Sequence, residues 1–145
     1  MNLLNISKLS ADEILAGSFG IEWESLRAKE DGKLSLALHP EIFGDKMINP
    51  VITTDFSESQ IEIITPTFDS IEKAFDNFLL LSDIVNSSLP EEEYLWFQSI
   101  PCILPYWDQI PIAKYSKEDQ SSQKYREDLA KKIWCQKTND FRCSL

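Results

Sequence analysis

The sequence predicts an α+β protein, in which a partial antiparallel sheet is backed by two main helices on one face. Two β-rich stretches, residues 19–27 and 51–65, alternate apolar and polar side chains, as half-buried strands do. Between residues 70 and 88, apolar side chains recur instead at helical spacing. Packing the apolar face of that helix on the apolar face of the strands accounts for all three patterns.

The first part of the chain predicts a short helix and a β-hairpin. A helix is expected to begin at Ser10, because a glutamate follows this serine three residues later, as in a capping box. The strand over residues 19–27 comes next. Asp31 and Gly32 then form a dipeptide that readily adopts the positive φ angles of a tight turn. Residues 33–38 are therefore expected to return as a second strand, antiparallel to the first.

Further along, we expect one more strand and two helices. Residues 51–65 are predicted to form a third strand, bent or interrupted near Asp55 and Phe56. The helix over residues 70–88 begins at a second capping box and ends before a proline, and its aromatic stripe is expected to pack on the sheet. A second amphipathic helix is predicted over residues 121–137, where two lysines near the end suit the helix dipole.

Length and charge limit the possible functions. The 145 residues suit one domain, and the net charge of −10 argues against binding nucleic acid or an anionic membrane surface. No apolar run reaches the roughly 20 residues that span a bilayer, and the first residues do not form a signal peptide. Three cysteines without metal-site spacing fit a reducing cytoplasm.

Carboxylates recur along both β-rich stretches. Glu22 and Glu24 share one face of the first strand, and Glu58 and Glu62 share one face of the third. A strand gains no stability by aligning like charges, so either water or a cation must lie opposite them. Spaced carboxylates on two strands are what a Mg²⁺ site requires, whereas a solvated face is the commoner role of alternating glutamates.

Two motifs resemble the bacterial glutamate–cysteine ligase family: GIEWESLR at residues 20–27 and TTDFSESQIEIITP at residues 53–66. The family includes stand-alone enzymes and fused forms that also make glutathione. The resemblance extends over nearly the whole chain but covers only the N-terminal part of the family's much longer catalytic domain. It implies that residues 1–145 are a single domain with a truncated, glutamine-synthetase-like fold.

The resemblance also implies a reaction and the residues that serve it. ATP would activate the side-chain carboxylate of glutamate for attack by cysteine, giving γ-glutamylcysteine in the first step of glutathione synthesis. Mg²⁺ or Mn²⁺ would neutralise the phosphate charge. No catalytic residue is assigned. The family's metal ligands match Glu22, Glu24, Asp55 and Glu62, and its substrate-binding residues match Phe56, Glu62 and Tyr115.

The remaining polar features are interpreted as structural. Glu58 is expected to be solvated, and His39, the only histidine, is interpreted as a turn residue. The acidic triplet Glu91, Glu92 and Glu93 is predicted to lie in a solvated loop, because consecutive side chains converge poorly on one ion.

The chain departs from the family pattern in three places. Trp23 stands where the family usually carries a polar or basic residue, and residues 137–145 lack the histidine ligand of the family's next strand. The chain also stops before the family's substrate-binding arginines and most of its nucleotide site. We therefore expect it to be incomplete and inactive alone. The alternative is a non-catalytic remnant, or a binding or regulatory module, that pairs with another chain covering its exposed sheet edge.

Overall fold

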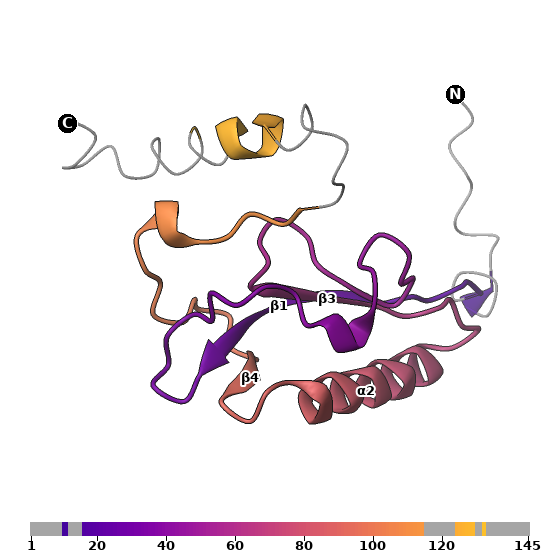
Figure 1. Ribbon diagram of the computed structural model, residues 1–145. Helices are drawn as coiled ribbons and strands as arrows, with labels where there is room; N and C mark the ends of the chain where they lie inside the picture. The colour runs from indigo at the N-terminus through magenta and orange to yellow at the C-terminus, as the bar shows by residue number, and fades with distance from the viewer. Residues whose placement is uncertain (1–9, 12–15, 115–123, 130–131, 133–145) are drawn as a thin grey trace.

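The computed structural model describes residues 10–11, 16–114, 124–129 and 132. A four-stranded antiparallel sheet organises them, with strand order β2-β3-β1-β4. Helix α2 runs along one face of this sheet, and η3 and the helical residues 124–129 lie on the other side (Figure 1). The predicted α+β class is therefore confirmed. The elements are β1 (Glu22–Lys29), η2 (Glu41–Phe43), β2 (Ile52–Thr53), β3 (Gln60–Ile64), α2 (Ile71–Ser88), β4 (Glu93–Trp96) and η3 (Trp107–Gln109).

The predicted first hairpin forms for only a few residues. Gly32 makes the turn with a φ of +76°, and one antiparallel bridge joins Ala28 to Leu34. The returning chain then leaves the sheet, so the predicted second strand is wrong beyond this bridge. The reason is that β3 takes the same edge of β1, where the Arg27 N–H donates to the Ser59 carbonyl at 2.8 Å. The other edge of β1 pairs with β4.

The predicted third strand is a hairpin of two strands. β2 and β3 run antiparallel, with Ile52 opposite Ile63 and Thr53 opposite Glu62. The interruption expected near Asp55 is thus a complete reversal of the chain. Within β3 the predicted alternation is confirmed, because Ile61 and Ile63 are fully buried while Glu62 is only half-buried.

The core lies between β3 and α2. Ile61 and Ile63 pack in one cluster with Val85 of α2, which is also fully buried. Trp23 of β1 packs against this cluster and meets Phe78 edge to face, with ring centroids 5.5 Å apart. Burying each large aliphatic side chain contributes about 1.5–3 kcal/mol, so this cluster contributes several kcal/mol to stability.

Helix α2 begins within one residue of the predicted start, but its N-cap is Ser70 and not Asp69, where the predicted capping box begins. The Ser70 hydroxyl accepts a hydrogen bond from the Lys73 N–H at 3.3 Å, which caps the first turn. The expectation that the aromatic stripe packs on the sheet is confirmed for Phe78, which packs against the core, but is wrong for Phe75, which is 50% exposed. Ile71 and Leu79, on the same flank as Phe75, are 61% and 45% exposed. The outer strands β2 and β4 are short, so the apolar flank extends past the sheet that α2 covers.

The other predicted helices are described only in part. Residues 124–129 and 132 are helical, and they lie across the sheet from α2 rather than beside it, which corrects the expectation of two helices on one face (Figure 1). The rest of residues 121–137 and most of the helix predicted at Ser10 fall outside the described residues. Within the described part of the chain, no helix has the length and apolar character needed to cross a bilayer.

Candidate functional site

Three glutamates share the face of the sheet that is turned away from α2. Glu24 of β1 is the direct partner of Glu62 on β3, and Glu22 lies opposite Ile64 two pairs further along. The odd-numbered residues of β1 carry the hydrogen bonds to β3, as Arg27 does with Ser59. Glu24 and Glu62 are therefore a non-hydrogen-bonded pair, whose side chains come closest.

The electrostatics of Glu62 show that the acidic side chains influence one another. Burial raises the pKa of the Glu62 carboxyl, and the charges of Glu24, Asp55 and Glu22 raise it further. Like charges placed directly opposite each other destabilise a sheet. The four predicted metal ligands, Glu22, Glu24, Asp55 and Glu62, thus lie on or next to the strand pair β1–β3. In the described residues, however, no three acidic, histidine or cysteine side chains lie close enough together to hold a metal ion by themselves.

Asp55 and Phe56 lie in the loop between β2 and β3, where they meet a residue that the sequence analysis missed. The Arg126 Nη1 donates to the Asp55 carbonyl at 3.0 Å, and its Nη2 lies 3.9 Å from the Asp55 carboxylate. The same guanidinium stands 5.9 Å from the centre of the Phe56 ring. These contacts join residues 71 positions apart, so no local pattern in the sequence indicates them.

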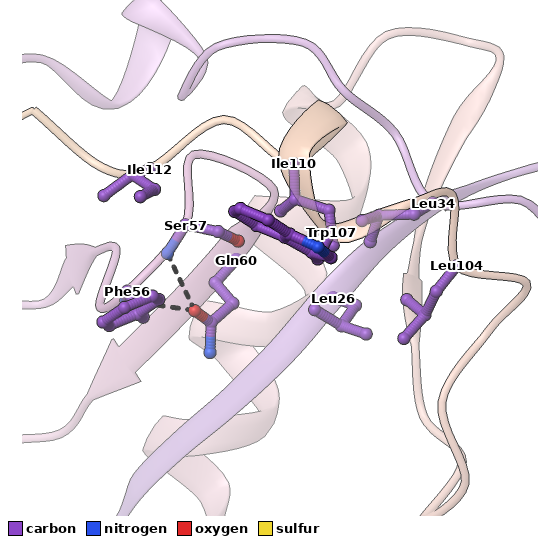
Figure 2. Close-up of a pocket in the computed structure, with 9 residues that line it drawn as sticks. All are labelled: Leu26, Leu34, Phe56, Ser57, Gln60, Leu104, Trp107, Ile110 and Ile112. Atoms are coloured by element: carbon purple, nitrogen blue, oxygen red, sulfur yellow. Dashed lines mark hydrogen bonds between the residues drawn. The ribbon is translucent and has the colours of Figure 1, made fainter. Parts of the chain in front are cut away.

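An apolar pocket of about 260 Å³ adjoins the acidic face (Figure 2). Phe56 and Gln60 form part of its wall, and Trp107 and Ile110 reach it from the segment after β4. Gln60 connects the pocket to the acidic face, because its Nε2 donates to the Glu24 carboxylate at 3.1 Å. Of the pocket residues, the sequence analysis identified only Phe56. The predicted substrate residue Tyr115 lies outside the described residues.

The Glu58 side chain is 3% exposed, so the expectation that it is solvated is wrong. Its carboxylate accepts hydrogen bonds from the His39 N–H at 3.0 Å, from the Lys114 N–H at 2.8 Å and from the Lys46 ammonium. Burial by itself would raise the Glu58 pKa, but these bonds lower it below its usual value. Strand alternation does not apply to Glu58, because this residue lies in the turn before β3.

The three glutamates of the acidic triplet lie in two different environments. Glu91 and Glu92 are exposed, as predicted. The loop prediction is wrong for Glu93, which begins β4 and whose carboxylate is 2.6 Å from the Arg27 guanidinium. The Ser35 hydroxyl donates to its other oxygen. The Arg27 and Glu93 side chains are only 1% and 5% exposed, so this pair is a buried structural ion pair.

His39 lies in the loop before η2, and its ring is buried against Phe43, with centroids 5.8 Å apart. Neither ring nitrogen has a hydrogen-bond partner among the described residues. Burial lowers the pKa of His39 to about 4, with further contributions from the charges of Lys46 and Arg27. The imidazole is therefore neutral at pH 7.

The fold of the described residues is also found in solved structures. A bifunctional glutathione synthetase from Pasteurella multocida matches 83% of the chain with a TM-score of 0.73 and 40% identity. A glutamate–cysteine ligase from Francisella tularensis, solved in complex with AMP, matches 77% of the chain with a TM-score of 0.70 and 34% identity. The described fold is thus the one found in these ligases.

The sequence comparisons define the family. The glutamate–cysteine ligase family model matches residues 3–137, and the chain belongs to this family. The glutathione biosynthesis bifunctional protein GshAB of Listeria monocytogenes is 50% identical over 127 residues, which are 88% of this chain and 16% of that protein. The glutamate–cysteine ligase of Clostridium acetobutylicum is 45% identical over 79% of this chain and 24% of its own length. The chain therefore spans only a small part of its relatives.

Proposed function

We propose that residues 1–145 are a single domain, the N-terminal portion of a glutamate–cysteine ligase catalytic domain. In the whole ligase this portion would serve the ATP-dependent ligation of the glutamate side-chain carboxylate to cysteine, which gives γ-glutamylcysteine, the first step of glutathione biosynthesis. Family membership and the crowded carboxylate of Glu62 support the proposal. The cytoplasm, which supplies ATP and both amino acids, is the proposed location.

The metal role falls to Glu22, Glu24, Asp55 and Glu62. Mg²⁺ and Mn²⁺ prefer carboxylate oxygens, and Mg²⁺ usually takes only one or two of them together with water and phosphate oxygens. A site of that kind does not require three protein ligands to converge beforehand. The position of Glu24 directly opposite Glu62 is the observation that supports this assignment, because a cation there relieves the repulsion between the two carboxylates. When bound, the metal would neutralise the charge of the ATP phosphates.

The acceptor role falls to Phe56, Glu62 and Tyr115. Phe56 lines an apolar pocket that suits an uncharged side chain such as the thiol of cysteine. Glu62 lies beside this pocket on the same sheet, where a carboxylate attracts the amino group of the acceptor. Tyr115 lies outside the described residues, and its assignment rests on its match to the family's substrate-binding tyrosine.

Metal binding provides the first test. We expect calorimetry to detect Mn²⁺ binding by the chain, and the Glu22→Gln/Glu62→Gln variant to lose it. The matched control is Glu91→Gln/Glu92→Gln, which removes two equally charged but exposed carboxylates outside the site. Equal binding by both variants and the parent chain would refute the metal assignment.

Activity provides the second test. Given glutamate, cysteine, ATP and Mg²⁺, the chain alone is expected to release no phosphate, because it covers only 16% and 24% of the length of two relatives in the family. Phosphate release above the rate of the Glu22→Gln/Glu62→Gln variant would contradict this expectation.

One observation favours a second function, a non-catalytic module that pairs with another protein chain. Phe97 is 57% exposed and stacks on Trp23 with centroids 5.0 Å apart, and Phe75 on α2 is also half-exposed. Apolar surface of this kind is typical of protein–protein contacts. Co-elution with the same organism's full-length ligase in size-exclusion chromatography, lost in Phe75→Glu, would support this function. Separate elution would oppose it.

A further inference from the structure

Gln60 is the first residue of β3, and its amide oxygen holds the loop that forms the pocket wall. The Phe56 N–H and the Ser57 N–H both donate to this oxygen, at 3.1 and 3.0 Å (Figure 2). These two donors fix the orientation of the Gln60 amide, because the opposite orientation would place its NH₂ group against both N–H groups. The Gln60 Nε2 must therefore point away from the loop.

The Nε2 points toward the acidic face and donates to one oxygen of Glu24 at 3.1 Å. Glu24 lies directly opposite Glu62 in the sheet. Two carboxylates in such a pair repel each other, so the exposed Glu24 side chain gains by turning away from Glu62. The bond from Gln60 opposes that movement and engages only one of the two oxygens of Glu24.

We propose that Gln60 is a positioning residue that couples the acceptor pocket to the metal-binding carboxylates. Its amide connects the backbone of Phe56, in the pocket wall, to the carboxylate of Glu24. Cation binding at Glu24 then tightens the pocket loop, and ordering of the loop favours the cation by the same amount. This inference rests on the proposed metal role of Glu24.

A double-mutant cycle tests the coupling. Mn²⁺ affinity is measured by calorimetry at pH 7 for the parent chain, Gln60→Met, Glu24→Gln and the double variant. We expect Gln60→Met to weaken binding about threefold to tenfold, the low end of what partners of metal ligands usually contribute, because Gln60 is half-exposed. The double variant should bind no more weakly than Glu24→Gln alone. Gln98→Met, at an exposed glutamine beyond β4, is the matched control and should bind like the parent chain.

A second readout separates coupling from mere support of the loop. Saturating Mg²⁺ should slow hydrogen exchange at the Phe56 and Ser57 amides in the parent chain but not in Gln60→Met. Gln60→Glu keeps an acceptor for both amides but places a second carboxylate oxygen beside Glu24. Without Mg²⁺, this variant should keep the exchange protection of the Phe56 and Ser57 amides, because the acceptor oxygen is retained.

The outcomes separate the two proposals. If the parent chain binds Mn²⁺ but the losses of the two single variants multiply in the double variant, the inference about Gln60 is overturned and the proposed function stands. If the parent chain binds no Mn²⁺, the metal part of the proposed function fails, and the inference fails with it. Unaltered Mn²⁺ affinity in a folded Gln60→Met variant would also overturn the inference alone.

Discussion

Replacing Glu58 with glutamine tests whether this side chain is buried and bonded, as the structure shows, or solvated, as strand alternation suggests. The substitution keeps the volume and removes the charge. One carboxylate oxygen accepts from the His39 N–H, and the other accepts from Lys46 and the Lys114 N–H. An amide has only one oxygen, so its NH₂ group must face one of these donors.

The expected loss of stability follows from those contacts. A buried N–H left without its acceptor costs about 1–3 kcal/mol. The bond to Lys46 also changes from a charge-assisted to a neutral one, which is roughly half as strong. Together these effects predict a loss of about 3 kcal/mol in the free energy of unfolding, or a fall of about 6–12 °C in Tm for a chain of this size.

Urea unfolding at pH 7, followed by circular dichroism, measures this loss. Glu92→Gln removes an exposed carboxylate and is expected to unfold like the parent chain. Because the pKa of Glu58 is lowered in the fold, its contribution is present above the unfolded-state pKa and disappears as pH falls through the folded-state value. If the free energy of unfolding falls by less than about 1 kcal/mol at pH 7, the Glu58 carboxylate is not held by buried hydrogen bonds, and the interpretation of a solvated side chain is restored.

Three further predictions concern other parts of the fold. Glu62→Gln should raise the Tm of the metal-free chain at pH 7, because the raised pKa of Glu62 means that the charged carboxylate destabilises the folded state. An unchanged or lower Tm would contradict this effect. As pH falls, the His39 side chain takes up a proton in the unfolded state before it does so in the folded state. Between pH 6.5 and about 4, the free energy of unfolding should therefore fall with pH, by at most about 1.4 kcal/mol per pH unit. His39→Leu should flatten this dependence in urea titrations. Ile61→Ala should cost about 2–5 kcal/mol in urea unfolding, whereas Ile84→Ala, at a site 44% exposed, should cost much less; equal losses would show that the core is misplaced.

Much of the fold depends on interactions between close neighbours in the chain, and these the sequence could predict. The start of α2 rests on a bond between Ser70 and a backbone N–H three residues later. The alternating burial in β3 follows from the geometry of any strand with one covered face. The two carboxylate motifs are contiguous and long, so they indicated the family that the comparisons later defined.

Other features depend on which distant segments meet, and local patterns do not contain that information. The first hairpin stays short because β3 competes for the same edge of β1. Glu93 is buried because β4 places it beside Arg27, 66 positions away in the sequence. Periodicity indicates that a helix has an apolar stripe, but the width of the sheet decides how much of that stripe is covered, which is why Phe75 remains half-exposed.

The candidate site combines both kinds of information. The sequence alone predicted Glu22, Glu24, Asp55, Glu62 and Phe56 as site residues from their motifs, and it determined that alternating residues of a strand share a face. Only the tertiary structure set Glu24 opposite Glu62, brought Arg126 to Asp55 and oriented the Gln60 amide between pocket and carboxylate. Strand register and side-chain contacts depend on how distant segments pack together, because packing decides which segments pair along a strand edge and which side chains meet.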